Sequence, residues 1–441
     1  MIVLPPHIQT ILNTLRQSGF EAYVVGGCVR DALLGITPCD WDVATSALPG
    51  EIKACFSHTA DTGLKHGTVS VVTPDTLVEV TTYRIDGDYI NNRSPASVEF
   101  TKSLTEDLSR RDFTVNAMAY SPESGIVDVF GGQEDLSARL IRAVGDPAAR
   151  FAEDALRIMR MFRFNAQLGF DIAPETLNGA ATAVHLIRNI SAERIAAELN
   201  KTLTAPAPSY ALRGMVQTGV MEYVVPEFME TVGFDQRTPY HDKSVDEHIL
   251  ESVDAVPCKL HLRLAMLFHD IGKPRTATMD SKGVGHFFGH GPESEVVTRA
   301  ALTRLKYPAV TIEYVCSLVK YHDAAINPTT ANVKRWLGKR GEEWLRDLLL
   351  VKRADNAAKP PVMTKGRQEF IAEIEEIVDE VLRSRECFSL ASLAVTGDDL
   401  MGAGIPQGPR IGEVLQALLG RVMEQPELNE KDVLLKMIRN I

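Results

Sequence analysis

The chain has 441 residues, of which 45% are hydrophobic and 24% are charged, a composition typical of a soluble globular protein with about three domains. Lys and Arg number 47 and Asp and Glu 58, which gives a formal net charge of −11. Taken alone, this charge argues against a nucleic-acid partner, because polyanions bind where positive charge is concentrated. The first residues show no basic stretch followed by an apolar run, and no segment approaches about 18 consecutive apolar residues, so neither a secretory signal nor a membrane span is expected.

Six cysteines are scattered along the chain and form no CxxC pair. They are Cys28, Cys39, Cys55, Cys258, Cys316 and Cys387. This usage favours reduced thiols over a disulfide scaffold, so we expect a cytoplasmic protein.

Two kinds of segment follow one another along the chain. In the first 130 residues, short β-branched runs such as "AYVVGG", "HGTVSVVTP" and "LVEVTTYR" are separated by Gly, Pro and Asp, which predicts a small mixed sheet. From about Asp135, apolar residues recur three or four positions apart, as in "SAERIAAELNKTL", which predicts helices. The expected fold class is therefore α+β.

The segment "YVVGGCVRDALLG" predicts an apolar strand, a turn at Gly26 and Gly27, and a helix that carries Arg30. Glycines let a polyphosphate approach the backbone, and the start of a helix favours anions. Because many strand–helix turns carry two glycines, an ordinary turn is the better interpretation of this segment alone.

The segment "CDWDVAT" follows about ten residues later and changes that interpretation. In a strand, the side chains of Asp40 and Asp42 point to the same face while Trp41 points away. Two adjacent carboxylates repel each other unless a divalent cation lies between them, and such ligands suit Mg²⁺ with nucleotide phosphates. The alternative is a solvated strand end with two acidic residues, which the nearby Gly-Gly turn makes the weaker hypothesis.

Two arginine-bearing segments come next. In "EDLSRRDFTVNAMAY", Arg110 and Arg111 can neutralise phosphate charge and Asp112 can accept a hydrogen bond from a ribose hydroxyl. We interpret "DPAARFAEDALRIMRMFRF" as one helix with a polar face that can meet a base's hydrogen-bonding edge. This face carries Glu153, Asp154, Arg157, Arg160 and Arg163. The alternative is an exposed helix with Glu–Arg pairs one turn apart.

The motifs "GGCVRDALLG…DWD", "RRDFTVNA", "EDALRIMRMFRF" and "SAERIAAEL" occur in this order between residues 20 and 200. Together they resemble the motifs of class II tRNA nucleotidyltransferases, a family of CCA-adding enzymes and bacterial poly(A) polymerases. The resemblance implies a head like that of DNA polymerase β, followed by an elongated helical neck, body and tail. The division it implies is a head at residues 1–134, a neck and body with the base-reading helix at 135–235, an HD-type helical domain at 236–360 and a tRNA-binding tail at 361–441.

The resemblance also implies roles for individual residues. Asp40 and Asp42 would hold Mg²⁺, with Glu79 as a third catalytic carboxylate. Asp154 and Arg157 would read the base of CTP or ATP, and Glu153 would orient Arg157. The full set implied to contact the nucleotide is Gly26, Gly27, Arg30, Arg111, Asp112, Asn116, Glu153, Asp154, Arg157, Arg160 and Arg163. Cys39 and Trp41 flank Asp40 where the family commonly has other residues, and their side chains are expected to point away from the metal.

The implied reaction is addition of the 3′-terminal CCA to tRNA from CTP and ATP without a nucleic-acid template. The primer's 3′-hydroxyl attacks the α-phosphorus, pyrophosphate leaves, and two Mg²⁺ ions stabilise the attacking and leaving oxygens. The stretch "YRIDGDYINNRSPASVEF", with Arg84, Asp86, Gly87, Tyr89 and Arg93, is associated in the family with the switch from C to A, and its presence argues against CC-only addition. An A-adding partner of a CC-adding enzyme and a poly(A) polymerase stay as alternatives, and the sequence does not distinguish a monomer from a homodimer.

A histidine-rich segment contains "DEHIL", "LAMLFHDIGKP", "GHFFGHG", "KYHD" and "KRADNAA", which resemble an HD metal-dependent phosphohydrolase domain. The ligands implied are His248, His269, Asp270, His290, His322 and Asp355, with His286 as an alternative to His290. Imidazoles with carboxylates suit a second divalent transition metal such as Ni²⁺, Mn²⁺, Co²⁺ or Fe²⁺. Phosphohydrolase activity is a hypothesis here, and the alternative is that these histidines bind no metal.

Basic residues near the carboxyl end offer further RNA contacts. Arg410 follows a glycine-rich turn, and Lys334, Arg335, Lys339 and Arg340 form a cluster, although a simple helix joint and a solvated helix face explain them equally well. The net charge of −11 does not exclude a nucleic-acid partner after all, because it averages over the whole surface. We expect tRNA to meet a local basic track formed by the arginines at 110–111 and 150–163.

Overall fold

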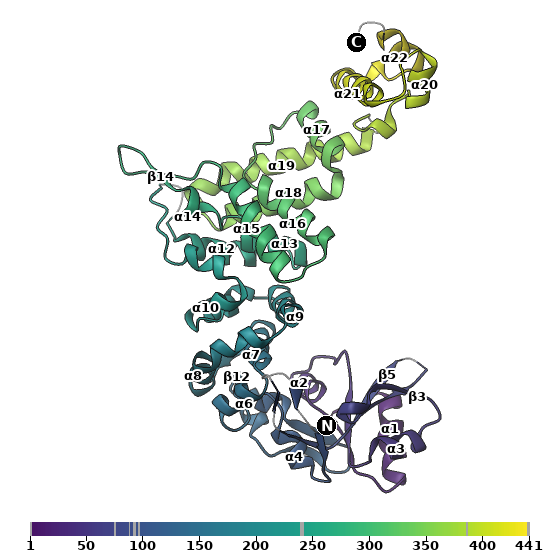
Figure 1. The fold of residues 1–441 in the computed structure, drawn as a ribbon, viewed down its shortest axis with the longest axis vertical. Helices are drawn as coiled ribbons and strands as arrows, with labels where there is room; N and C mark the ends of the chain where they lie inside the picture. The colour runs from purple at the N-terminus through teal and green to yellow at the C-terminus, as the bar shows by residue number, and fades with distance from the viewer. Residues whose placement is uncertain are drawn as a thin grey trace. The chain divides into compact units, whose positions relative to one another are not determined.

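The computed structural model describes residues 2–438, except residues 75, 88, 91–93, 96–97, 239–241 and 385–386. The chain divides into two compact units, Met1–Pro226 and Glu227–Ile441 (Figure 1). The first unit has a mixed sheet followed by helices and the second is mainly helical, which confirms the predicted α+β class. In the described part of the chain, no helix combines the length and the apolar character that crossing a bilayer requires.

A seven-stranded mixed sheet forms the base of the first unit. Its spatial order is β11-β10-β1-β2-β5-β4-β3. Neighbouring strands are antiparallel except β2 and β5, which run parallel. The strands are β1 (Ala22–Val25), β2 (Asp42–Thr45), β3 (Thr59–Gly63), β4 (Thr68–Val72), β5 (Leu77–Thr82), β10 (Met118–Ser121) and β11 (Gly125–Asp128).

Both faces of this sheet are covered, because successive side chains of a strand point to opposite faces. Val24 packs into a core with α1 (Pro6–Gln17) and α3 (Pro49–Cys55) on one face. Its neighbour Val25 packs on the other face, in a smaller cluster with α4 (Leu104–Ser109). Burial on both faces fixes the strands in register.

The parallel pairing of β2 and β5 brings two acidic residues together. Val43 pairs with Val80, so Asp42 and Glu79, which precede them, lie side by side at one end of the two strands. Adjacent positions in a sheet register point to the same face. This edge of the sheet therefore gathers carboxylates that are 37 residues apart in the chain.

The remaining elements of the first unit are mostly helical. The helices are α2 (Gly27–Leu33), α5 (Gly132–Ser137), α6 (Pro147–Glu153), α7 (Leu156–Leu168), α8 (Pro174–Ala183), α9 (Ala192–Leu203), α10 (Pro208–Gln217) and α11 (Met221–Val224), with 3-10 helices η1 (Leu64–His66), η2 (Thr114–Asn116) and η3 (Val184–Asn189). Short strand pairs are β6 (Arg84–Asp86) with β9 (Val98–Phe100), β7 (Tyr89–Ile90) with β8 (Ser94–Pro95), and β12 (Leu140–Ile141) with β13 (Asp171–Ile172). Of the residues named above in the segment 83–100, Arg93 lies outside the described residues.

The prediction of one continuous base-reading helix is wrong, because the helix is interrupted at Asp154. α6 ends at Glu153 and α7 begins at Leu156, and Asp154 between them has an extended backbone with φ −131° and ψ 103°. Its Oδ1 accepts a hydrogen bond from the Leu156 backbone N–H at 3.1 Å. The carboxylate satisfies a helix-start donor that has no intrahelical partner, so this break and not helical periodicity sets the position of Asp154.

The second unit is built from helices around one buried region and ends in a smaller helical cluster. Its helices are α12 (Val245–Ala255), α13 (Leu260–Phe268), α14 (Lys273–Thr276), α15 (His290–Arg304), α16 (Ala309–Tyr321), α17 (Thr330–Arg340), α18 (Glu342–Ala357), α19 (Pro361–Ser384), α20 (Gly397–Gly402), α21 (Pro409–Glu424) and α22 (Lys431–Met437), with η4 (Pro226–Thr231), η5 (Leu390–Ser392) and η6 (Pro426–Leu428). β14 (Thr278–Met279) and β15 (Gly285–His286) form a short hairpin. Residues of α20, α21 and α22 share a hydrophobic core of their own, centred on Leu400, Leu418 and Leu434.

Candidate active site

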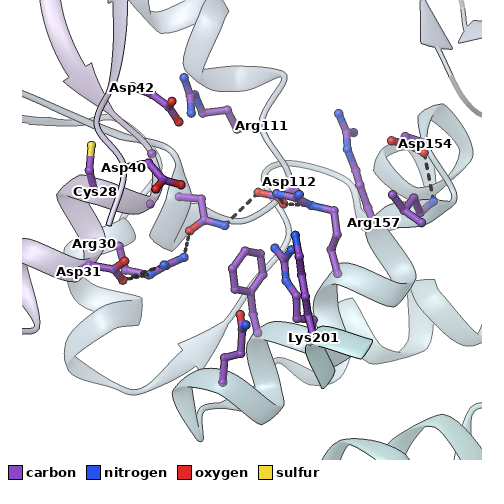
Figure 2. Close-up of a pocket in the computed structure, with 18 of the residues that line it drawn as sticks. Cys28, Arg30, Asp31, Asp40, Asp42, Arg111, Asp112, Asp154, Arg157 and Lys201 are labelled. Carbon is purple, nitrogen blue, oxygen red and sulfur yellow. Dashed lines mark hydrogen bonds and ion pairs between the residues drawn. The ribbon is translucent and has the colours of Figure 1, made fainter. Parts of the chain in front are cut away.

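A cavity of about 710 Å³ opens in the first unit between the sheet and the helices that follow it. Figure 2 shows Asp40 and Asp42 together on one side, Asp112 near the middle, and Asp154 with Arg157 on the other side. Of the nucleotide contacts expected from the sequence, all except Glu153 line this one cavity. Positive charge is concentrated in the same place, since the lining includes Arg30, Arg110, Arg111, Arg157, Arg160, Arg163, Arg194 and Lys201.

The carboxylates lie at the edge of β2. Asp42 is its first residue, Asp40 precedes it, and both line the cavity. Trp41 is absent from that lining and packs, partly buried, against the core to which α1 contributes. This alternation is the one predicted, although the strand begins two residues later than the prediction. Cys39 is exposed and lines the cavity as well.

The charges around Asp42 indicate a place for a cation. Burial raises the pKa of Asp42, the Arg111 guanidinium opposes that rise, and the carboxylates of Glu79 and Asp40 add to it. Glu79 lines a second cavity that also contains Asp40 and Asp42. Three oxygen donors that repel one another are the ligand type that Mg²⁺ prefers, so these residues fit a divalent metal.

The missing side chain at Gly26 leaves room for Arg111, whose charge acts on Asp42. Gly26 has a φ of +81°, and a Cβ placed there would lie 2.7 Å from Nη1 of Arg111. A side chain at position 26 would therefore be strained and would collide with the guanidinium. On α2, which follows this turn, Arg30 Nη1 donates to Asn116 Oδ1 at 2.6 Å.

Asp112 is a buried carboxylate with defined partners. Its Oδ2 lies 2.6 Å from Arg160 Nη2, and its Oδ1 accepts from Asn116 Nδ2 at 3.1 Å. Burial alone would raise the pKa of Asp112, but the charge of Arg160 and the hydrogen bond from Asn116 outweigh burial and lower the pKa to about 2. The ionised Asp112 and the guanidinium of Arg160 on α7 thus hold each other in place inside the cavity.

The Arg157 guanidinium is held from two directions. Glu153 Oε2 accepts from its Nη1 at 2.5 Å, the expected contact, and the backbone oxygens of Arg150 and Arg110 accept from Nη1 at 3.0 Å and Nη2 at 2.8 Å. Asp154 Oδ2 in turn accepts from Arg194 Nη2 at 3.1 Å. A fixed donor therefore lies beside a fixed acceptor on one wall of the cavity.

The second unit brings together all six of the predicted histidine and aspartate ligands. His248, His269, Asp270 and Asp355 form one group and Asp270, His290 and His322 another, with the potential ligand atoms of each group within 4.8 Å of one another. Asp270 Oδ2 lies 3.3 Å from Nε2 of His248 and His269, whereas Oδ1 lies 3.4 Å from Nε2 of His290 and His322. One carboxylate thus faces both groups with different oxygens.

The orientation of these imidazoles suits a metal. Nδ1 of His269, His290 and His322 lies 2.7, 2.8 and 2.7 Å from the backbone oxygens of Met266, Phe287 and Val319. A ring that donates through Nδ1–H to a carbonyl presents the Nε2 lone pair to a metal. The alternative ligand His286 instead lies on β15, 3.3 Å from Asp280, outside both groups.

Comparison with known proteins identifies the family. Residues 22–142 match the model of the poly A polymerase head domain, residues 169–231 that of an RNA and SrmB-binding site of polymerase A, and residues 292–438 that of tRNA nucleotidyltransferase domain 2. The CCA-adding enzyme of Levilactobacillus brevis is 36% identical over 429 residues, which make up 97% of this chain and 96% of that protein. The chain belongs to the CCA-adding enzyme family. The CCA-adding enzyme of Geobacillus thermodenitrificans is 50% identical over 222 residues, 50% of this chain and 55% of that protein.

Solved CCA-adding enzymes share the fold. The Bacillus stearothermophilus CCA-adding enzyme in complex with CTP matches with a TM-score of 0.76 at 31% identity, covering 99% of this chain and 98% of that one. The Thermotoga maritima CCA-adding enzyme complexed with tRNA-CCA has a TM-score of 0.59 at 21% identity, covering 99% and 96%, a likeness of fold alone. CCA-adding enzymes are tRNA nucleotidyltransferases, and their family uses a divalent metal. The resemblance of the motifs between residues 20 and 200 to the tRNA nucleotidyltransferases is therefore confirmed.

Among the residues that line this cavity and were not predicted from the sequence are Phe164, Arg194 and Lys201. Phe164 lies beneath three guanidinium groups, with its ring centroid 5.1, 5.5 and 4.2 Å from Cζ of Arg30, Arg160 and Arg163. Arg194 and Lys201 line the cavity from α9. Their spacing of seven residues places them on one helix face, and this signal was available in "SAERIAAELNKTL".

The basic cluster expected near the carboxyl end is not a single exposed surface. Lys334 is 2% exposed, and its Nζ lies 3.4 Å from the Met423 backbone oxygen. Arg340 stacks over Tyr321 and Trp344. Both expectations for this cluster, an RNA contact and a solvated helix face, are therefore wrong for Lys334, because the lysine is buried between packed helices.

Proposed function

We propose that this chain adds the 3′-terminal CCA to tRNA, using CTP and ATP and no nucleic-acid template. One observation carries the proposal: a single cavity holds the carboxylates of Asp40 and Asp42, a set of arginines and the Asp154–Arg157 pair. The residues proposed for phosphoryl chemistry, for triphosphate binding and for base recognition therefore lie in a cavity where a single nucleotide can contact all of them. The relatives named above support the substrate classes, since one was solved with CTP and another with tRNA-CCA.

Base selection follows from the Asp154–Arg157 pair. Cytosine and adenine each present an exocyclic amine donor beside a ring-nitrogen acceptor, whereas uracil and guanine present a carbonyl acceptor beside a ring N–H. An ionised carboxylate only accepts and a guanidinium only donates. Asp154 and Arg157 thus match cytosine and adenine, and a wrong base would leave buried polar groups unpaired. Glu153, which contacts Arg157 Nη1, orients the donor.

The arginines hold the nucleotide while the carboxylates govern the chemistry. Arg30, Arg111, Arg160 and Arg163, with the turn at Gly26 and Gly27, bind the triphosphate, and Asp112 and Asn116 bind the sugar. The primer's 3′-oxygen forms a bond to the α-phosphorus and the bond to pyrophosphate breaks. Mg²⁺ held by Asp40, Asp42 and Glu79 would supply the positive charge that stabilises the attacking and leaving oxygens.

The tRNA is proposed to meet a local basic track on an acidic protein. The cavity arginines and Lys201 form such a track near the reacting atoms, and the cluster of α20, α21 and α22, within the proposed tail at 361–441, would contact tRNA elsewhere. The other proposed boundaries are a head at 1–134, a neck and body at 135–235 and an HD-type domain at 236–360. A cytoplasmic location agrees with six cysteines that form no disulfide.

One assay tests this function and its alternatives. Purified protein is given tRNAs lacking CCA, CA or only A, and an unrelated RNA. Both CTP and ATP are present, one of them labelled, and the products are sized. Full CCA addition extends all three substrates to the same end. Extension only of the tRNA that lacks A indicates an A-adding enzyme, and long A tracts on unrelated RNA indicate a poly(A) polymerase. Either of these two results would contradict the proposal.

A second function is favoured by the six-residue cluster of the second unit. We propose that His248, His269, Asp270, His290, His322 and Asp355 bind a divalent transition metal, because three of the rings are oriented by carbonyls and the Nε2 atoms converge. Neutral imidazoles and carboxylates suit Ni²⁺, Mn²⁺, Co²⁺ or Fe²⁺. Burial raises the pKa of Asp270, and the Lys273 ammonium, whose Nζ lies 2.6 Å from Oδ2, is among the charges that outweigh burial and hold this pKa well below its usual range. Asp270 is therefore ionised, as a metal ligand must be.

The surroundings of this cluster suit a phosphoester substrate. A cavity of about 370 Å³ contains His322 and Asp355 and is also lined by Lys352, Lys359 and Phe370. Cations beside a metal cluster attract phosphate, and an exposed aromatic ring offers a base a stacking surface. We therefore propose phosphohydrolase activity, tested with 2′,3′-cyclic nucleotides and phosphomonoesters on metal-reconstituted protein. Hydrolysis that survives in His269→Ala would contradict this activity.

A further inference from the structure

The carboxylate of Asp154 is held at both oxygens. Oδ1 accepts from the Leu156 backbone N–H at 3.1 Å, and Oδ2 accepts from Arg194 Nη2 at 3.1 Å. The first contact comes from α7 and the second from α9. Because the terminal torsion of an aspartate is broad and nearly two-fold, two such contacts from different elements select one orientation.

The Arg194 guanidinium contacts Asp154 through one of its two terminal nitrogens, Nη2. Its Nη1 is buried and, within the described residues, has no hydrogen-bond partner. A buried donor without a partner costs free energy, so the position is not one that stability alone would favour. Arg194 nevertheless lines the nucleotide cavity and directs its other terminal nitrogen to Asp154.

α9 is fixed against α7 by a second ion pair. Glu198, one turn after Arg194, has its Oε2 3.1 Å from Arg163 Nη1, and the two side chains are 7% and 9% exposed. This buried pair holds the helix on which Arg194 lies. Arg194 therefore reaches Asp154 from a rigid support.

We propose that Arg194 is a positioning residue that determines nucleotide specificity. It holds the Asp154 carboxylate with its remaining lone pairs directed at the exocyclic amine of cytosine or adenine. Without Arg194, the carboxylate can turn and accept the ring N–H of uracil or guanine instead. This inference rests on the proposed base-reading function of Asp154 and names the residue that makes it selective.

Three variants test the inference. Arg194→Ala removes the contact, Arg194→Lys keeps a positive donor, and Arg188→Ala is a matched control, because Arg188 contacts Tyr223 in the same unit and lies outside the cavity lining. Single-turnover incorporation of CTP and UTP is measured on tRNA lacking CCA, and that of ATP and GTP on tRNA lacking only A. We expect the ratio of CTP to UTP incorporation to fall about tenfold in Arg194→Ala and less in Arg194→Lys. Arg188→Ala should keep the wild-type ratio.

The readout separates specificity from folding. A merely structural role of Arg194 would lower incorporation of all four nucleotides by the same factor, and an unchanged CTP to UTP ratio in Arg194→Ala would overturn the inference. If the wild-type protein incorporates neither CTP nor ATP, the proposed function itself fails. The two failures are therefore distinguishable in one experiment.

Discussion

Asp112 and Arg160 form an ion pair with 2.6 Å between Oδ2 and Nη2, in which the aspartate side chain is 7% exposed. Asp112 follows α4 and Arg160 lies on α7, so the pair joins the segment beside the sheet to the helix that lines the far wall of the cavity. The pair also leaves an ionised carboxylate inside a cavity rich in arginine.

Acid should weaken this pair in a defined pH range. The pKa of Asp112 falls from 3.8 to about 2 on folding, so its stabilising contribution is present above pH 4 and is lost as the pH falls through the folded-state value. This difference between the unfolded-state and folded-state pKa corresponds to about 2 kcal/mol in the free energy of unfolding. We expect the free energy of unfolding in urea of the wild type minus that of Asp112→Asn to fall by that amount between pH 5 and pH 2. A difference in the free energy of unfolding that stays constant with pH would contradict the assignment. Asp61→Asn, at an exposed position of β3, is the control.

Removal of one carboxylate at the edge of β2 should stop the chemistry. Asp42→Ala takes away an oxygen donor proposed to hold Mg²⁺, and we expect incorporation of CTP and ATP to fall at least about a hundredfold. Binding of tRNA, followed by gel shift, should change little because the arginines are untouched. Asp61→Ala should retain full activity. Substantial turnover by Asp42→Ala would overturn the mechanism.

Phe164 should affect nucleotide affinity without affecting selectivity. Three arginines lie over its ring, Arg163 at 4.2 Å from the centroid, and a π face favours nearby cations. In Phe164→Leu we expect the KM for CTP and for ATP to rise together by about three- to tenfold, with the CTP to UTP ratio unchanged. Phe164→Tyr, which keeps the ring, should behave like the wild type. A change in selectivity would show that Phe164 acts on the base and not on the arginines.

Metal binding at the cluster of the second unit can be measured independently of catalysis. After chelation and reconstitution with Mn²⁺ or Ni²⁺, we expect the wild type to retain metal and His269→Ala to bind it at least about tenfold more weakly. His286→Ala is the matched control, because this histidine lies outside both ligand groups. Incorporation of CTP and ATP should be equal in all three proteins. Equal metal content in wild type and His269→Ala would disprove the site.

Features of this protein that depend on local order could be predicted from the residues alone. The alternation around Trp41 separated two carboxylates from a core residue, the glycines at 26 and 27 marked the turn, and the ordered motifs identified the family. These features follow from strand periodicity, backbone sterics and fixed spacing, which need no knowledge of distant segments.

The other positions depend on contacts between segments that are distant in the chain. The break at Asp154 depends on a carboxylate that caps α7 and meets Arg194 of α9, and helical periodicity cannot foresee a partner 40 residues away. The position of Glu79 beside Asp42 required the parallel pairing of β2 and β5. Lys334, read as a surface cation, is buried because helices far along the chain cover it. Contacts between distant segments set these positions, since the free energy of packing and of paired buried charges overrides the local pattern.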